Sequence, residues 1–478
     1  MDSFDLLVIG GGINGAAIAR DAAMRGAKVL LVEKDDLAAH TSSASSKLIH
    51  GGLRYLEYYE FRLVREALRE REVMLRTAPH IVRPLRFVLP HCPALRPHWL
   101  IRSGLLLYDL FSIRGGLPRS RRVGRRDRAL LEPLKDKRRV LSYWDAWVDD
   151  SRLTVLNAVA AAEQGAEIAV RTEFLSARRD GEVWRAELSG GRSVAAAAIV
   201  NAAGPWVAEV LGGRLGETSD SRVRLVKGSH IVVPALWDGD QAYILQQADG
   251  RVVFALPFQG DFTLIGTTDI PVEGPREAAI DADEIRYLCE AVGRYFVREV
   301  APADVVWSYS GVRALFDDGR AEAKAVTRDY HLELDADPGP KLLSVFGGKI
   351  TTARALAQEA LDRLGIDGRR STSHSFLPGG DLYPDFLAWL DSVAAWMPRP
   401  LLARLSRAYG TRLRDMIGDA RALADLGRDF GAGLHEAELR WLRDREFART
   451  ADDVLWRRTK LGLAMSPEQA RAVEEWLA

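Results

Sequence analysis

Three glycines near the start of the chain have a spacing that suits phosphate binding. Gly10, Gly12 and Gly15 follow the pattern G-x-G-x-x-G, directly after an apolar run at 4–9 that predicts a short buried strand. An Ala-rich stretch at 13–25 predicts a helix after them. In such a loop the first glycine makes a tight turn, the second admits a pyrophosphate, and the third lets the helix pack on the strand. The helix N-terminus adds partial positive charge for the phosphates.

A second strand completes this unit and ends in an acidic residue. Residues 28–32, apolar after Lys28, predict the strand, and Glu33 follows it. A carboxylate about twenty residues beyond the glycines is placed to accept hydrogen bonds from an adenosine ribose. Together these features predict a dinucleotide site, and they leave NAD and FAD both open.

A polar segment at 41–55 has the residue types that a loop lying against a flat ring needs. Its sequence is TSSASSKLIHGGLRY. Glycines permit a close approach of the backbone, and hydroxyl and amide groups satisfy the polar atoms of a ring. A solvated serine-rich linker would explain 41–46 but not the apolar and aromatic residues that follow. The segment therefore indicates a ring-binding loop.

Two later segments combine an apolar strand with a turn of small residues. The first is AIVNAAGPW at 198–206, and the second is a predicted strand at 342–346 followed by GGKITT. A helix begun by threonine caps is predicted to extend from there to about residue 364. A helix N-terminus aimed at a flavin's pyrimidine edge would stabilise the negative charge that the ring gains with a hydride.

The composition is that of a globular protein with two or three domains. The chain has 478 residues, of which 47% are hydrophobic and 28% charged, and its formal net charge is zero. We expect the two cysteines, Cys92 and Cys289, to form neither a disulfide framework nor a zinc site, which favours a reducing compartment and no metal chemistry. We expect no signal peptide, and no segment reaches the roughly 18–20 apolar residues of a spanning helix.

A series of motifs resembles those of FAD-dependent glycerol-3-phosphate dehydrogenase, the membrane-associated family that passes electrons to quinone. The motifs occur in order from Ile9 to Gly462, across nearly the whole chain. They are IGGGINGA, TSSASSKLIHGGLRYLE, WVDDSRL, NAAGPW, KGSHIVVP, YILQ, IGTTD, YSGVRAL, TRDY, SVFGGKITT and LWRRTKLG.

The resemblance implies an α/β fold with a glutathione-reductase-like FAD-binding domain of the D-amino-acid oxidase type. That domain would be discontinuous and would combine the segments 1–80, 140–220 and 335–370. FAD is then the expected cofactor of the glycine loop.

The remaining segments are assigned to three further parts. Residues 81–139 would be a membrane-proximal insertion, and 221–334 a substrate domain. Period-two stretches at 229–233 and 251–255 predict an antiparallel sheet in that domain. Amphipathic patterns without a strand signal predict a helical C-terminal domain at 380–478.

The same resemblance assigns cofactor contacts to residues of the matched motifs. They are Gly10, Gly12, Ile13, Asn14, Gly15, Glu33, Lys34, Thr41, Ser42, Ser45, Ser46, Lys47, Leu48, His50, Gly51, Gly52, Ala203, Gly204, Trp206, Gly348, Lys349 and Thr351.

A substrate phosphate in a semi-enclosed site needs several cations, preferably forked guanidinium groups. The matched motifs supply candidates for this role and for neighbouring polar contacts. They are Arg54, Tyr55, His230, Arg313, Arg328 and Lys349.

Oxidation of an alcohol by a flavin also needs a base for the hydroxyl proton, and histidine suits that role near neutral pH. His50 in HGG and His230 in GSH are the histidines of the matched loops. We expect His50 to be the base, with Arg313 as a second catalytic residue, and His230 is the alternative base.

The resemblance implies sn-glycerol 3-phosphate as substrate and ubiquinone or menaquinone as acceptor, at the cytoplasmic face of a bacterial inner membrane. The apolar run at 98–111 is too short to span a bilayer, and an arginine-rich run at 119–128 follows it. We expect peripheral docking on an anionic membrane surface through residues 96–128. Whether the protein forms a homodimer is left open.

Two other functions remain as alternatives. A flavin oxidase would deliver the electrons to oxygen, and hydrogen peroxide formed under air would identify it. A flavin-bound assembly or RNA-modification protein would need a broad basic face. Zero net charge with one short arginine run argues against that class, so we expect no nucleic-acid partner.

Overall fold

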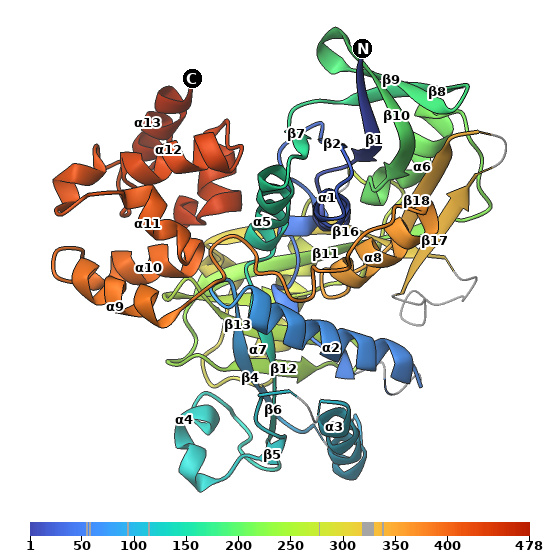
Figure 1. Ribbon diagram of the computed structural model, residues 1–478. Coiled ribbons are helices and arrows are strands. Elements are labelled where there is room, and N and C mark those ends of the chain that lie inside the picture. Colours follow the sequence, from blue (N-terminus) through green and yellow to red (C-terminus); the bar gives the residue numbers. More distant parts are fainter. Residues whose placement is uncertain are drawn as a thin grey trace.

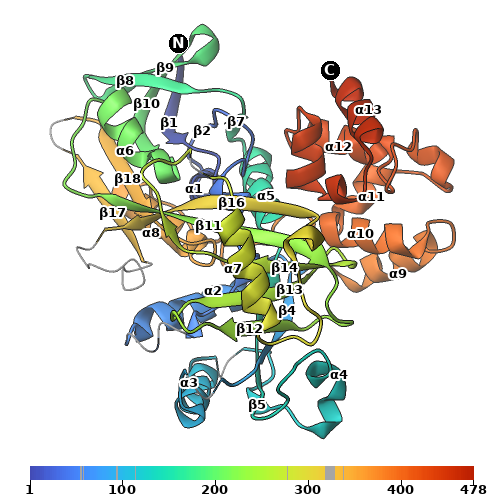
Figure 2. The same ribbon diagram turned by 180° about the vertical axis from the view of Figure 1, so that it is seen from behind.

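The computed structural model of the protein describes residues 1–53, 56, 59–92, 95–112, 115–276, 278–317, 329–336 and 339–478. In these residues the chain forms two sheets and a separate group of C-terminal helices (Figures 1 and 2). Three of the predicted substrate residues, Arg54, Tyr55 and Arg328, lie outside the described residues.

The first sheet has a parallel centre built from segments far apart in the sequence. Its order is β17-β18-β10-β1-β2-β7, with β9 beside β10 and β8 beside β9. Only β17, β9 and β8 pair antiparallel with their neighbours among the described strands. The strands are β1 (Asp2–Ile9), β2 (Val29–Val32), β7 (Glu167–Ala169), β8 (Phe174–Asp180), β9 (Val183–Leu188), β10 (Arg192–Asn201), β17 (Tyr330–Asp335) and β18 (Lys341–Gly347).

Three helices pack together against one face of this sheet: α1 (Ile13–Met24), α5 (Asp150–Glu163) and α8 (Ala353–Leu364). The central helix, α1, is rich in alanine, and these small side chains let it approach both neighbouring helices and the sheet. The predicted strand–loop–helix–strand unit at the start of the chain is thereby confirmed. Thr352 is the N-cap residue of α8, as predicted, but its buried side chain makes no capping hydrogen bond.

The second sheet is mainly antiparallel, as predicted for the segment 221–334. Its order is β15-β11-β14-β13-β12-β4-β6-β3, with β16 beside β11 and β5 beside β6. The strands are β3 (Leu48–Ile49), β4 (Val82–Leu89), β5 (Arg121–Arg122), β6 (Leu141–Val148), β11 (Val223–Pro234), β12 (Ala242–Gln246), β13 (Val252–Phe258), β14 (Phe262–Gly266), β15 (Ile270–Pro271) and β16 (Trp307–Phe316).

Strands β4 and β6 come from outside the predicted substrate segment. The domain ranges implied by the resemblance put β4 in the insertion and β6 in the FAD-binding domain, yet they pair with each other and β4 pairs with β12. Backbone hydrogen bonding thus joins them to the second sheet, although the predicted domain ranges themselves stay predictions.

Helices cover both faces of the second sheet. One face carries α7 (Ala282–Gly293), and the other carries α2 (Phe61–Thr77) and α3 (His98–Phe111). Figure 1 places α3, β5 and the short helix α4 (Arg128–Leu131) together at the end of the molecule away from the N-terminus. No helix within the described ranges is both long and apolar enough to cross a membrane.

The C-terminal part is helical, as predicted, and has a core of its own. Leu405, Leu413, Leu439 and Val473 are among its buried residues. The helices are α9 (Pro384–Val393), α10 (Arg399–Tyr409), α11 (Arg412–Ile417), α12 (Glu436–Arg445) and α13 (Pro467–Leu477), and a π-helical turn covers Asp453–Arg458. Figures 1 and 2 show this domain beside α5.

Candidate active site

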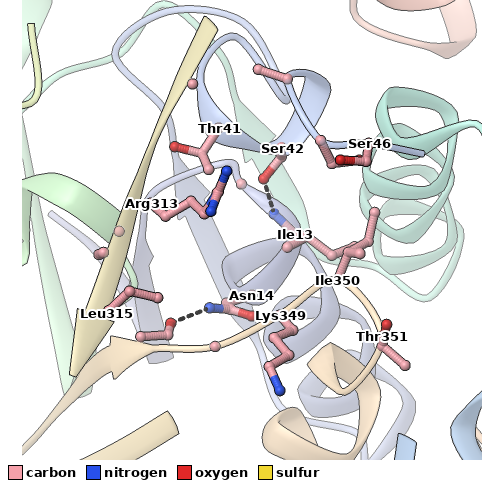
Figure 3. A pocket seen from close by; sticks show the side chains of 18 of the residues that line it. Ile13, Asn14, Thr41, Ser42, Ser46, Arg313, Leu315, Lys349, Ile350 and Thr351 are labelled. Carbon is pink, nitrogen blue, oxygen red and sulfur yellow. Dashed lines mark hydrogen bonds between the residues drawn. The ribbon is translucent and has the colours of Figure 1, made fainter. Parts of the chain in front are cut away.

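A cavity of about 1230 Å³ is lined by residues of both sheets. The glycine loop, the ring-binding loop and the turn after β18 form one part of its wall, which Figure 3 shows from close by. Strands β11 to β13 and β16 of the second sheet, together with α3, supply the other part. Segments separated by more than three hundred residues therefore meet around one space.

The glycine loop leaves no room for side chains. A Cβ atom at Gly15 would lie 1.9 Å from the carbonyl oxygen of Gly10, and Gly10 itself has a φ of +109°. Gly12 and Ile13, at the start of α1, line the cavity. The Ile13 N–H donates to Ser42 Oγ at 2.9 Å, which ties the ring-binding loop to this helix N-terminus (Figure 3).

Glu33 closes the unit at the end of β2. Its carboxylate accepts hydrogen bonds from the backbone N–H groups of Gly11, at 2.7 Å, and Asp35, at 2.9 Å. Burial raises the pKa of Glu33. Glu33, Asp35 and His40 also lie close enough to share a metal ion, although two backbone bonds already engage the Glu33 carboxylate.

The turn after β18 is connected to the glycine loop through Asn14. Its Nδ2 donates to the carbonyl oxygen of Gly347 at 3.2 Å (Figure 3). Gly347 and Gly348 have φ values of +82° and +101°, which glycine adopts without strain. Lys349 and Thr351 follow and line the cavity.

Asp150, at the first position of α5, holds the ring-binding loop from behind. Its carboxylate accepts from Ser45 Oγ at 2.7 Å and from Lys47 Nζ at 2.8 Å. Lys47 and Asp150 are both buried. Both charges are removed from water, so the loss of either residue would leave the other charge buried and unpaired, at a cost in stability.

Most of the predicted cofactor residues line the cavity, and three do not. Lys47, Gly15 and Gly51 lie behind the wall, where they support it. Lys47 pairs with Asp150, Gly15 packs against Gly10, and the Gly51 N–H donates to the Tyr108 hydroxyl at 2.8 Å.

Arg313 enters the cavity from β16 and is held by a motif to which sequence reasoning gave no role. Its Nη1 donates to Asp269 Oδ1 at 2.5 Å, and its Nη2 donates to Thr267 Oγ1 at 2.9 Å. Both partners line the cavity and belong to IGTTD. The sequence therefore contained the IGTTD motif, but only the folded structure shows that its Thr267 and Asp269 side chains bind Arg313.

His230 lies on β11, which pairs with β16. Its Nε2 is 2.9 Å from Ser46 Oγ, its ring stacks on Tyr309, and it is 2% exposed. Burial, together with the positive charges of Arg313 and Lys47, holds the pKa of His230 well below its usual value. The imidazole is therefore neutral at physiological pH.

His50 lines the same cavity and is only half-buried. Its ring lies 6.3 Å from that of Phe254, measured between centroids. Of the two histidines that the sequence singled out, His50 is the more accessible to a molecule in the cavity.

Known proteins match the chain along its whole length. The FAD dependent oxidoreductase family matches residues 5–363, and the C-terminal domain of alpha-glycerophosphate oxidase matches 370–478. D-erythritol 1-phosphate dehydrogenase of Brucella abortus is 51% identical over 99% of this chain and 98% of its own length. Glycerol-3-phosphate dehydrogenase of Pseudomonas aeruginosa is 50% identical (99% and 95%), and aerobic glycerol-3-phosphate dehydrogenase of Escherichia coli is 46% identical (100% and 98%). The chain belongs to the FAD-dependent glycerol-3-phosphate dehydrogenase family.

A solved structure has the same fold. Glycerol-3-phosphate dehydrogenase of Bacillus halodurans, complexed with FAD, aligns with a TM-score of 0.72 at 24% identity, covering 99% of this chain and 94% of that one. FAD is the cofactor of this dehydrogenase family, and the cavity fits it. The glycine loop suits a pyrophosphate, Glu33 a ribose, and the loops around Ser46 and Gly348 a flavin ring.

Gly12→Leu should abolish FAD binding, because the new side chain would stand at the start of α1, where the pyrophosphate must approach. A Cβ there already lies 3.1 Å from Ser42 Oγ. The measurement is the flavin absorbance of the purified protein. Gly293→Leu, where a Cβ meets no atom within 4 Å, is the control and should stay yellow. A Gly12→Leu protein with a full complement of FAD would contradict this assignment.

Proposed function

We propose that the protein oxidises a small polyol phosphate, first of all sn-glycerol 3-phosphate, to the corresponding ketone. FAD, when bound, accepts the hydride from the carbinol carbon. The observation that carries the proposal is the arrangement of Arg313, Lys349 and two histidines around the cavity that also holds the cofactor loops. Relatives named glycerol-3-phosphate dehydrogenase at 50% and 46% identity support this choice of substrate.

D-erythritol 1-phosphate is the second candidate substrate. The relative named for that reaction is 51% identical, so overall identity does not separate the two. Both molecules carry a phosphate monoester next to a secondary alcohol, so the same phosphate-binding cations and the same base would serve either. The longer polyol differs by one additional CHOH group, which the cavity must accommodate.

The phosphate site centres on Arg313. Hydrogen bonds to Asp269 and Thr267 hold its guanidinium group in one orientation, so the group is already positioned before a ligand binds. Lys349 lines the same cavity from the turn after β18 (Figure 3). We assign both cations to the phosphate, together with Arg54, Tyr55 and Arg328 of the matched motifs.

Under anaerobic conditions sn-glycerol 3-phosphate should bleach the flavin of the wild-type protein, and unphosphorylated glycerol should not. D-erythritol 1-phosphate, tested in parallel, ranks the two candidate substrates by the rate of bleaching. Arg313→Ala should lower kcat/KM about ten- to a hundredfold, because loss of a charge-assisted contact costs about 1.5–3 kcal/mol.

Arg224→Ala is the control for the loss of a positive charge, because Arg224 lies on the same sheet but pairs with Asp317 away from the cavity. It should keep both FAD and kcat/KM. Equal bleaching by glycerol and its phosphate would refute the phosphate clamp.

We assign the proton-accepting role to His50. A base must reach the substrate hydroxyl, and His50 is exposed to the cavity, whereas His230 is enclosed and its Nε2 faces Ser46. His230 then orients the Ser46 hydroxyl within the ring-binding loop.

His50→Asn should slow flavin reduction about a hundredfold or more and make its rate less sensitive to pH near neutrality. Stopped-flow reduction at saturating substrate measures this step. His230→Asn is the comparison and should retain the pH response. A His50→Asn enzyme with wild-type reduction kinetics would move the role to His230 or to no residue at all.

We further propose that the electrons pass to a quinone at a membrane surface. Helix α3 lines the cavity with residues such as Ile101 and Leu107, and its outer side exposes Trp99 at 68% and Leu110 at 60%. An apolar helix between solvent and cofactor cavity suits an apolar acceptor. Exposed arginines follow it, and each contributes about 1 kcal/mol beside anionic lipid.

Changing Arg119, Arg122 and Arg126 together to Ser should weaken binding to anionic liposomes and lower activity with a long-chain quinone. Activity with a soluble dye should survive, because the cavity is unchanged. The control changes three exposed arginines of the C-terminal domain, Arg440, Arg445 and Arg471, to Ser. If the first variant still sediments with anionic liposomes as the wild type does, the docking surface lies elsewhere. Formation of one hydrogen peroxide per substrate oxidised under air would favour an oxidase.

A further inference from the structure

The motif at 455–462 near the end of the chain carries buried cations that face the cofactor-binding part of the molecule. The side chain of Arg458 is fully buried, and its two terminal nitrogens donate to the Asp36 carboxylate at 2.6 and 2.8 Å. Arg457 Nε adds a third bond to Asp36, at 2.6 Å. Such a forked contact holds the carboxylate in one orientation and also compensates its negative charge.

Asp36 belongs to the turn that presents Glu33 to the cofactor. In this turn Glu33 accepts from the N–H groups of Gly11 and Asp35, and the Ala38 N–H donates to the Gly11 carbonyl oxygen at 3.1 Å. The turn therefore lies directly on the glycine loop. Arg458 holds the same turn from the side of the C-terminal domain.

Lys460 makes a second connection, to the start of α5. Its buried Nζ donates to Ser151 Oγ at 2.7 Å. The preceding residue, Asp150, is the carboxylate that holds Ser45 and Lys47 of the ring-binding loop. One motif of the C-terminal domain thus reaches the supports of both loops that carry FAD.

We propose that the C-terminal domain is a positioning element for FAD, acting through Arg458 on the 33–38 turn and through Lys460 on the start of α5. These residues do not line the cavity, so they hold the cofactor through Glu33 and the ring-binding loop. Asp36 is buried, and loss of the forked Arg458 contact would leave its carboxylate held by the single bond from Arg457, so the turn would be held less firmly. FAD should then dissociate more readily although no direct contact is lost.

The experiment measures FAD affinity of apoprotein by flavin fluorescence titration, separately from turnover. Arg458→Met should raise the dissociation constant about tenfold or more, the scale of one lost charge-assisted contact. The matched control is Arg404→Met. Arg404 forms an equally forked pair with Glu438, at 2.6 and 2.7 Å, but entirely within the C-terminal domain. It should lower the melting temperature and leave FAD affinity unchanged.

Arg458→Lys keeps the charge without the fork and should give an intermediate dissociation constant. If Arg458→Met does not fold, Arg457→Gln keeps the buried Arg458–Asp36 pair and removes one ion-paired hydrogen bond to Asp36. It should still weaken FAD binding, by about threefold, on the scale of a single partly exposed ion pair. The proposal would be overturned if the folded Arg458 variants bound FAD with wild-type affinity. If Arg458→Met does not fold, wild-type affinity in Arg457→Gln would overturn it. In either case the Arg458–Asp36 pair would be an interdomain contact only. Equal FAD loss in Arg404→Met would overturn it as well.

Discussion

The cofactor cavity depends on a backbone approach that excludes side chains. Gly15 of α1 packs so closely on Gly10 that a single Cβ would overlap the Gly10 carbonyl oxygen. This contact places the N-terminus of α1 beside the ends of β1 and β10, where the partial positive charge of the helix would face the phosphates of bound FAD. The Glu33 turn, the ring-binding loop and the turn after β18 are each hydrogen-bonded to residues 11–14 beside this contact.

Buried ion pairs connect the three parts of the molecule at the back of this site. Lys47 with Asp150, Arg152 with Glu446, and Arg458 with Asp36 each join segments that are distant in the sequence. A buried pair is rarely a large net gain in stability, because desolvation offsets the attraction, but loss of one partner is costly. Each of these pairs therefore opposes separation of the two segments that it joins.

The substrate side that we propose follows a different principle, because charge there must remain available to a ligand. Arg313 is partly compensated by Asp269 and partly exposed to the cavity. His230 is kept neutral by burial and by neighbouring cations. Helix α3 closes the far part of the wall, and the Tyr108 hydroxyl links it both to Gly51 and to the buried Asp145. The surface that we propose for the acceptor is thus connected to the turn that carries His50.

The sequence by itself determined the local units and the family. The glycine spacing, the apolar strand and Glu33 specify a strand–loop–helix–strand unit because turn geometry and helix packing are local, and the ordered motifs identify the rest by resemblance. Only the tertiary structure decided which segments share a wall. Strands β4 and β6 join the second sheet through hydrogen bonds that no local pattern encodes. Asp269 and Arg458 acquire their partners in the same way, since the pairing of charges far apart in sequence depends on how the chain is folded.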